Sequence, residues 1–424
     1  TKLLKKGGCF GFVATNTISQ GVTRKSSLDI LIDNDVNIFN CLKSFQWPGK
    51  ASVITAVISA VNGKWHGQRV CDFKRCKYIN SLLEVSAPDV GKPNRLLRNR
   101  GFCYQGSTMW GEEFFISGET ALKFLAKQNN KVVVKQAMGG KELNNSPALK
   151  PERWAINFGE MNKDQAAQFV DVFEYIKSLI KRKRSALDSK KYSRMVNEWW
   201  KYFHSRSDLY NTIESLNLSR VLARSRVSDL HMIGFIDNSL IYTDALVVFC
   251  YETWEHFSLL QSNIHDLWLR TYASTMKNDV RYIVTDCFET FPFPEQVDKL
   301  KGAGESYYKY RKSMMIDTGL GLTKTYKRFH SSMEVGEEIN KLRSLHVEMD
   351  QAVSSSYGWC DLDLGHDFYE TRQGIRFTIS DEVRLELLQR LLKLNHERNE
   401  AEVAQGLHDM KTTNKAKTSH KKKV

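Results

Sequence analysis

Residues 7–21 read Gly-Gly-Cys-Phe-Gly-Phe-Val-Ala-Thr-Asn-Thr-Ile-Ser-Gln-Gly, and this stretch decides the predicted fold of the N-terminal region. The apolar run from Cys9 to Ala14, entered through a Gly-Gly turn, predicts a buried parallel strand. The polar residues 15–20 then form a loop at the carboxyl end of that strand, where open α/β sheets bind their ligands. The same residue types also cap helices, so spacing alone leaves a ligand-binding loop and an ordinary capping loop both open.

The predicted sheet continues to residue 61 and contains a second candidate turn. We expect a helix over 26–34 and strands over 36–44 and 52–61, with Phe45-Gln46-Trp47-Pro48-Gly49-Lys50 linking the two strands. Trp47 is either a core tryptophan at a turn or an aromatic platform on which a base extruded from a duplex can stack. Phe45 is the second candidate for such a platform.

Composition restricts the class of protein and its compartment. At 424 residues the chain is long enough for two or three domains. It contains no apolar run near the roughly 18 residues that a membrane span requires, and no secretory signal is visible. Its eight cysteines form no Cys-x-x-Cys pair and its histidines show no metal-ligand spacing, so we expect no metal site. We therefore expect a cytoplasmic protein without a membrane partner.

The net charge of +14 is unevenly distributed along the chain. Residues 404–424 carry six lysines and no acidic residue after Asp409, which predicts a disordered basic tail, either merely solvated or binding phosphate without specificity. Residues 177–226, which we call the basic belt, combine many cations and interleaved aromatic residues with few carboxylates. The basic belt predicts a surface that faces nucleic-acid phosphates, and the alternative is an ordinary solvated helix face.

Two groups of polar side chains are the candidate nucleic-acid contacts. The first surrounds Gly139-Gly140, where paired glycines let a backbone approach a partner closely, although a surface hairpin has the same composition. Its members are Lys135, Lys141, Asn144, Asn145 and Arg153. The second group comes from the basic belt and consists of Lys181, Arg182, Lys183, Arg184, Arg206, Arg220, Arg224 and Arg226.

Periodicity predicts the elements of the remaining chain and a fold class of α/β plus α+β. In a mixed α+β domain over 100–295 we expect strands over 114–116, 132–134, 154–158 and 280–284, helices over 118–127, 162–184 and 253–276, and a hairpin of 232–236 with 240–248. A helical domain over 296–403 has predicted helices over 296–315, 335–356 and 381–399. The first domain spans 1–70, and a linker over 71–99 follows it.

Several strings along the chain, in the same order, resemble one protein family. They lie at 10–21, 47–51, 153–158, 198–200, 260–265, 281–294, 321–326, 342–350 and 357–359. Together they resemble the C-terminal portion of the long single-chain adenine-specific DNA methyltransferases of type II restriction–modification and phage-defence systems. Lys327 departs from the family pattern, in which an asparagine is expected.

The resemblance implies a function for each predicted domain. Residues 1–70 would be the end of a class I, Rossmann-like methyltransferase sheet, 100–295 a DNA target recognition domain, and 296–403 a helical closing domain. The complete enzyme would use S-adenosylmethionine to methylate the exocyclic amine of an adenine flipped out of double-stranded DNA, in a bacterial cytoplasm near the nucleoid. The pocket for the flipped base would consist of Thr15, Asn16, Thr17, Gln20 and Trp47.

The front half of such an enzyme is missing from this sequence. The family holds its target amine with an Asn/Asp-Pro-Pro-aromatic tetrapeptide, but no two of the seven prolines are adjacent. No Gly-rich turn between a strand and a helix is visible for the cofactor. We therefore expect no catalytic residue and no methyl transfer from this chain alone, with an upstream half or a partner chain supplying the rest. The alternatives are a non-catalytic, sequence-specific DNA-binding specificity subunit that acts with a separate methyltransferase chain, and a scaffold without a specific ligand.

Overall fold

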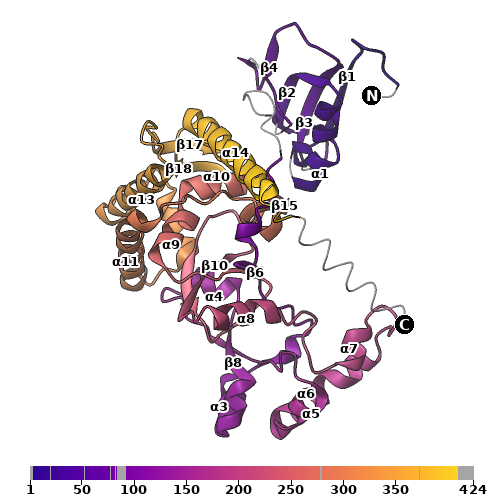
Figure 1. Cartoon of the computed structure of the whole chain (residues 1–424), viewed down its shortest axis with the longest axis vertical. Coiled ribbons are helices and arrows are strands. Elements are labelled where there is room, and N and C mark those ends of the chain that lie inside the picture. Colours follow the sequence, from indigo (N-terminus) through magenta and orange to yellow (C-terminus); the bar gives the residue numbers. More distant parts are fainter. Residues whose placement is uncertain are drawn as a thin grey trace. The chain divides into compact units, whose positions relative to one another are not determined.

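The computed structural model describes residues 3–19, 21–51, 53–76, 78–81, 83, 92–276, 279–371 and 373–408. The chain divides into two compact units. The first unit contains Thr1–Leu97, Leu267–Pro292 and Asp381–Val424, and the second contains Arg98–Asp266 and Phe293–Ser380. The segment predicted as one helical domain, 296–403, is therefore divided between the units, because its last helix belongs to the first (Figure 1). Residues 84–91 of the predicted linker and 409–424 of the predicted tail lie outside the described residues.

The N-terminal part of the first unit is built on a mixed five-stranded sheet in the order β1-β3-β2-β4-β5. Its strands are β1 (Cys9–Thr15), β2 (Val36–Gln46), β3 (Ile54–Asn62), β4 (Arg69–Cys71) and β5 (Lys74–Cys76). A 3₁₀ helix (Asn16–Ser19), α1 (Gly21–Lys25) and α2 (Leu28–Asp33) connect β1 to β2. Strand β3 runs antiparallel to both β1 and β2, whereas β4 runs parallel to β2.

The prediction of a buried parallel strand at Cys9–Ala14 is wrong. Strand β1 pairs antiparallel with β3, from Cys9 opposite Val61 to Thr15 opposite Thr55. Its residues alternate between exposed and half-buried, because only Phe10, Phe12 and Ala14 face the core. The outward residues include Gly11 and Val13, which makes an alternating strand read as a continuous apolar run. A Rossmann-like methyltransferase sheet therefore stays a prediction.

The remaining segments of the first unit are joined by one buried amide. They contain most of α10 (Asn263–Tyr272), β15 (Ser274–Met276), β16 (Asp279–Arg281), a π-helix (Val284–Phe288) and α14 (Asp381–Ala404). Asn395 of α14 donates hydrogen bonds to the carbonyls of Asn94 and Thr290 at 2.8 and 2.6 Å. Its side-chain oxygen also accepts the Asn94 N–H at 2.7 Å, so every strong hydrogen-bonding group of this amide is engaged.

The second unit is a mixed α+β structure with two four-stranded sheets. The antiparallel sheet has the order β12 (Gly234–Asp237), β10 (Arg220–Ser225), β14 (Leu246–Phe249) and β6 (Cys103–Gln105). The other has the order β13 (Ile241–Tyr242), β8 (Val134–Met138), β9 (Arg153–Ile156) and β7 (Phe115–Ile116), with β8 and β13 parallel. The predicted hairpin of 232–248 is wrong, because β12 and β14 both pair with β10 while β13 pairs with β8.

Helices cover these sheets, and two predicted helices are broken. The second unit contains α3 (Gly118–Leu125), α4 (Gly140–Asn145), α5 (Lys163–Ala167), α6 (Val170–Ser185), α7 (Ser193–Asn197), α8 (Ser207–Ser215), α9 (Trp254–Gln261), α11 (Lys301–Thr318), α12 (Leu322–Phe329) and α13 (Glu337–Ser356). The predicted helix over 162–184 divides at Phe169, whose backbone leaves the helical conformation. The predicted helix over 253–276 ends at Gln261, and the buried carboxylate of Asp350 accepts the N–H that begins α10, at Asn263.

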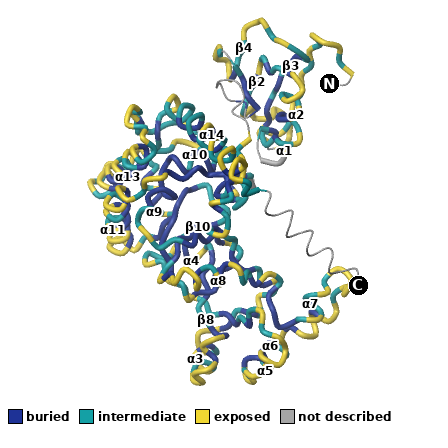
Figure 2. The backbone as a smooth tube through the Cα atoms, in the orientation of Figure 1, coloured by how far each residue is buried: buried dark blue, intermediate teal, exposed yellow. Residues whose placement is uncertain are grey.

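The closing part of the second unit is not wholly helical, because a hairpin of β17 (Asp367–Thr371) and β18 (Gly374–Thr378) follows α13. Short strand β11 (Val227–Ser228) and 3₁₀ helices at Leu97–Asn99, Glu112–Phe114, Gln128–Val132 and Asp298–Leu300 complete the described elements. Buried chain runs through β10 and α9, whereas α3 and α5 are largely exposed (Figure 2). No helix within the described residues is long and apolar enough to cross a membrane.

Candidate nucleic-acid interface

The predicted base pocket lies at one edge of the N-terminal sheet. Thr15 and Phe45 both oppose Thr55 of β3, so the ends of β1 and β2 lie on either side of the same residue. The two strands run in the same direction because both are antiparallel to β3. The structure therefore brings the loop after Thr15 and the turn at Trp47 to one sheet edge.

Trp47 is presented to solvent by a tight turn. The backbone N–H of Trp47 donates to the Val53 carbonyl at 3.0 Å, and 42% of the residue is exposed. A Cβ atom on Gly49 would come within 2.4 Å of the indole nitrogen of Trp47, so this ring position requires glycine. The interpretation of Trp47 as a core tryptophan is wrong. Exposed Phe45, Val53 and Ile54 extend the apolar surface at this edge.

The polar loop beside this edge is compact. Asn16 and Thr17 lie in the 3₁₀ helix, and the hydroxyls of Thr15 and Thr17 are 2.7 Å apart. The Asn16 carbonyl accepts a hydrogen bond from the Ser19 hydroxyl at 3.3 Å. Gln20 lies outside the described residues. That these residues contact a base stays a prediction.

A Gly-Gly turn connects β8 to α4, which the sequence interpretation did not recognise as a strand-to-helix turn. The Gly139 N–H donates to the carboxylate of Glu142 at 3.0 Å, so this carboxylate already occupies the start of the short helix. Arg153 holds the same carboxylate through Nε and Nη2, at 2.5 and 3.2 Å, and its guanidinium lies 4.3 Å from the centre of the Phe115 ring. Arg153 is thus engaged within the fold, which does not fit its predicted role as a nucleic-acid contact.

Of the remaining polar residues near this turn, Asn144 lies against the end of β10. The Ser225 hydroxyl donates to the side-chain oxygen of Asn144 at 2.9 Å, and Gly140 approaches Ser225 closely. Arg226 follows directly, and its N–H donates to the Ala245 carbonyl at 2.8 Å. Lys141 and Asn145 are exposed on α4, and Lys135 is half-buried on β8. We call α4 with residues 225–226 the α4 corner.

Arg184 of the basic belt is a structural residue. It is 3% exposed, and its two terminal nitrogens donate to the carbonyls of Trp199, Lys201, Met109 and Trp110 at 2.8, 2.5, 2.9 and 3.1 Å. Burial lowers the pKa of its guanidinium to about 10, so the group remains charged at neutral pH. The prediction that Arg184 faces phosphate is wrong, because all four hydrogen bonds tie it to the backbone of its own unit.

Two further arginines of the belt are also engaged internally. Arg224 is 1% exposed, donates from Nε to the Ser225 carbonyl at 3.1 Å, and lies 3.0 Å from His231 Nδ1. The prediction that Arg224 contacts DNA is therefore wrong. Arg220 is half-buried between the rings of Phe235 and Trp254, at 3.7 and 4.3 Å, and burial lowers its pKa.

Carboxylates on α6 itself and on other segments neutralise further cations of the belt. Lys183 forms an ion pair with Glu113, Lys177 one with Glu174 at 2.6 Å, and Arg194 one with Glu160 at 2.8 Å. The inference that the belt lacks acidic compensation is wrong, because Glu113, Glu160 and Glu174 all lie outside residues 177–226. Lys181 and Arg182 are exposed and have no ion pair within the described residues. Arg206 is half-buried at the start of α8, in the left-handed conformation at φ 56°.

Three aromatic residues of the basic belt are buried. Trp199, Trp200 and Tyr202 are at most 5% exposed. The Trp200 indole donates to the Met161 carbonyl at 3.0 Å, and the Tyr202 hydroxyl donates to the Ile156 carbonyl at 2.7 Å. These rings pack the belt onto β9, so they are not available for base stacking.

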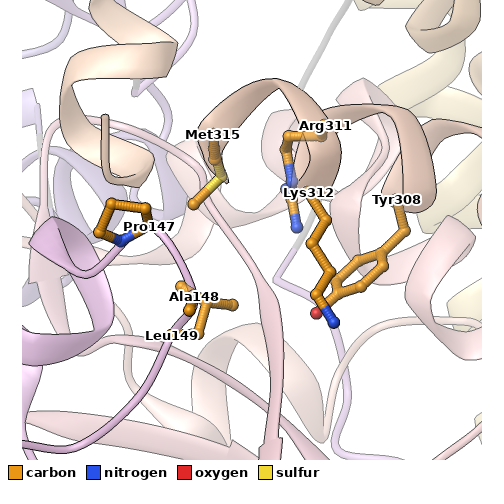
Figure 3. A pocket seen from close by; sticks show the side chains of 7 residues that line it. All are labelled: Pro147, Ala148, Leu149, Tyr308, Arg311, Lys312 and Met315. Carbon is orange, nitrogen blue, oxygen red and sulfur yellow. The ribbon is translucent and has the colours of Figure 1, made fainter. Parts of the chain in front are cut away.

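A small cavity lies between the loop after α4 and helix α11 (Figure 3). Its wall consists of Pro147, Ala148, Leu149, Tyr308, Arg311, Lys312 and Met315. Its volume of about 10 Å³ is close to what one water molecule occupies. It therefore has no room for a nucleotide-like cofactor. Within the part of the chain that the structure describes, no cluster of His, Cys, Asp and Glu could hold a metal ion.

Most of the second unit, with a segment of the first, lies within residues that match a DNA target recognition domain. Residues 96–295 match the family described as MmeI, target recognition domain. A solved structure, described as the type IIL restriction–modification enzyme MmeI in complex with DNA, has a similar fold, with a TM-score of 0.68 and 18% sequence identity. The resemblance to restriction–modification enzymes that the sequence indicates is confirmed by these two findings. No curated protein matches the chain.

The likeness extends across both units. It covers 92% of this chain but only 50% of the MmeI chain, so the present chain spans about half the length of that enzyme. At this level of identity, the likeness shows a shared fold. The predicted recognition domain, 100–295, and the residues matched by the family, 96–295, are nearly the same stretch.

Proposed function

We propose that this chain is the DNA-recognition half of an adenine-specific DNA methyltransferase of a restriction–modification or phage-defence system. The observation that carries the proposal is the match of residues 96–295 to a target recognition domain. A fold shared with an enzyme described in complex with DNA supports a double-stranded DNA partner. The net charge of +14 suits the same partner, because cations that meet phosphates release counterions and strengthen binding.

Two surfaces divide the work in this proposal. In the second unit, Lys181 and Arg182 meet phosphates, and exposed Lys141 and Asn145 of the α4 corner contact the duplex. In the first unit, the sheet edge at Trp47 stacks the flipped adenine, and the hydroxyls of Thr15 and Thr17 lie beside it. Support for the second assignment comes from the exposure of Trp47 and from the common edge at which both segments end.

The methyl donor is assigned to residues outside this chain. S-adenosylmethionine supplies the methyl group in enzymes of this kind, but the described residues do not fit it. At the described Gly-Gly turn between a strand and a helix, the Gly139 N–H already binds the Glu142 carboxylate. This carboxylate would repel the carboxylate of S-adenosylmethionine. Within the described residues β1 pairs only with β3, and its outer edge can accept another strand from an upstream half.

The proposal is tested by methyl transfer from labelled S-adenosylmethionine to duplex DNA, using this chain alone and this chain joined to its upstream half. Activity of the joined form on adenine, and none of the chain alone, is the expected result. DNA binding is measured in parallel across a salt series. No activity in either form together with sequence-specific, salt-sensitive binding would favour the non-catalytic specificity subunit, and binding that ignores salt would overturn both functions.

A further inference from the structure

Three thiols gather on one face of the N-terminal sheet. Cys41 of β2 and Cys71 of β4 are direct partners in the parallel pair, and their sulfur atoms are 3.1 Å apart. Both residues are buried, at 0% and 2% exposure. Cys71 opposes Lys74 on β5, and Cys76 lies two residues further along, so it projects from the same face. Cys76 is half-buried and packs against the same core.

We propose that Cys41 and Cys71 form a reversible disulfide when the chain meets a peroxide, and that Cys76 is the thiol through which the oxidant acts. In a reducing cytoplasm the thiol form is the resting state, and cytosolic disulfides are typically transient or redox-sensing. The inference is independent of the proposed function, because it rests on the first unit alone.

The relay through Cys76 follows from burial. Only a thiolate attacks a peroxide, and the hydrogen bond to Cys71, together with burial, raises the pKa of the Cys41 thiol far above its usual range. Burial and Cys71 also raise the pKa of Cys76, but the cations of Arg69 and Lys43 oppose that shift. Cys76 is also the member of the trio that is not buried. It is therefore the sulfur that a small oxidant can reach.

The chemistry balances with hydrogen peroxide as the oxidant. The Cys76 thiolate attacks one peroxide oxygen, which gives a sulfenic acid and hydroxide. The Cys71 thiol gives its proton to that hydroxide as it attacks the Cys76 sulfur, and a second hydroxide leaves. The Cys41 thiol then gives its proton to the second hydroxide as it attacks the Cys71 sulfur and releases the Cys76 thiolate. The protons of Cys41 and Cys71 convert the two hydroxides to water. Two thiols are thereby oxidised by one peroxide, and Cys76 is regenerated.

The disulfide would add a covalent link between β2 and the hairpin formed by β4 and β5. Strand β4 meets β2 through only two register pairs, Asn40 with Val70 and Cys41 with Cys71. Three further hydrogen bonds support it. The Asp72 N–H donates to the Cys41 carbonyl at 2.9 Å, the Lys43 N–H to the Asp72 carboxylate at 2.8 Å, and the Arg69 guanidinium to the Asn37 side-chain oxygen at 3.1 Å. A covalent link at Cys41 would restrict opening of this hairpin, because it removes the separated state of the two strands.

The test treats the full chain with hydrogen peroxide, blocks remaining thiols with a maleimide under denaturing conditions, and maps peptides by mass spectrometry. We expect a crosslinked peptide containing Cys41 and Cys71, which disappears again on reduction with dithiothreitol. Cys76→Ser should slow its formation by about tenfold, because the reactive thiolate is removed, whereas Cys9→Ser at an exposed site should not. If Cys41 and Cys71 stay fully alkylatable, or end in bonds to other cysteines, the proposal is overturned.

A second measurement uses no variant of a buried cysteine. Amide hydrogen exchange over residues 69–76 should slow in the oxidised wild-type chain and recover after reduction. Unchanged exchange in a chain whose crosslink has been mapped would overturn the proposed restriction of the hairpin.

Discussion

The basic belt and the N-terminal sheet edge were both expected to meet DNA, and the structure places their side chains in opposite environments. In the belt, Arg184 and Arg224 donate to groups inside the fold. At the sheet edge, Phe45 and Trp47 each keep 42% of their surface exposed. The basic belt, which has the composition of a binding surface, is therefore partly buried. The turn at Trp47, which could have been part of the core, is exposed to solvent.

The contrast teaches that residue type does not reveal whether a side chain's hydrogen-bonding capacity is already used. Within α6, Arg182 and Arg184 are two residues apart, but one is exposed and the other has four backbone acceptors. A guanidinium has five donors and can tie together several carbonyls at once. The predictions below separate cations that hold the fold together from those available to a ligand.

The largest effect is expected from Arg184→Met. It leaves three buried carbonyls and one part-buried carbonyl without their donor, which should lower the free energy of unfolding by about 3–5 kcal/mol. Arg184→Lys should rescue little, because an ammonium cannot reproduce the planar fork. Chemical denaturation of the full chain measures both variants.

The matched control is Arg182→Met on the same helix. This exposed substitution should change the free energy of unfolding by no more than about 0.5 kcal/mol. Equal stability of the Arg184→Met and Arg182→Met chains would show that the buried guanidinium of Arg184 does not stabilise the fold more than an exposed one.

Much of the helical structure could be predicted from the sequence, because apolar spacing is a local property. Helix α13 begins within two residues of its predicted start and ends at the predicted residue. Strand direction could not be predicted, because β1 owes its antiparallel pairing to residues 55–61, forty or more positions further along the chain. The burial of Arg184 could not be predicted either, because the carbonyls that accept its hydrogen bonds come from residues 109–110 and 199–201.

The candidate site was partly predictable for a different reason. The sequence resemblance placed the 15–20 loop and Trp47 in one pocket, and the strand register brings Thr15 and the Trp47 turn to one edge. Ser225, which joins Asn144 at the α4 corner, could not be found, because no sequence signal places β10 beside α4.

Acid should destabilise the folded chain through histidines whose pKa is lowered by burial, whereas lysines and arginines stay charged throughout. Burial lowers the pKa of His256 to about 4, and the pKa values of His265 and His346 are also lowered by burial. In the unfolded chain these histidines titrate near 6.5, so below that pH the unfolded state binds more protons. The free energy of unfolding should therefore fall as the pH decreases from about 6.5 to 4, with about 2–3 kcal/mol from His256.

Denaturation at a series of pH values checks this in the wild-type chain and in His256→Gln. The variant should lose part of the pH dependence, because its amide does not titrate. Identical pH profiles for the two chains would contradict the lowered pKa of the half-buried His256.

Trp47→Ala tests the open side of the comparison. In the chain joined to its upstream half, we expect kcat/KM for methyl transfer to fall by an amount equivalent to about 1–3 kcal/mol, the usual contribution of a base stacked on an aromatic ring. Stability should change little, because the ring is 42% exposed. Trp65→Ala, in the loop between β3 and β4, is the control, since Trp65 stacks on Phe39 of β2 at 4.1 Å and should affect stability instead. Equal losses of methyl transfer in both variants would remove the special role of Trp47.

The smallest expected effect is on the salt dependence of DNA binding, and it distinguishes Lys181 and Arg182 from Lys177 and Lys183 on the same helix. The double variant Lys181→Gln, Arg182→Gln should weaken DNA binding and reduce the slope of log affinity against log salt by about 0.9 for each phosphate that is no longer neutralised. Lys177→Gln with Lys183→Gln is the matched control, because Glu174 and Glu113 already neutralise these lysines. Its salt slope should change less, although both variants remove the same number of positive charges. Fluorescence anisotropy with a labelled duplex measures the slopes, and equal slopes would mean that net charge, rather than the availability of individual cations, determines how the belt meets DNA.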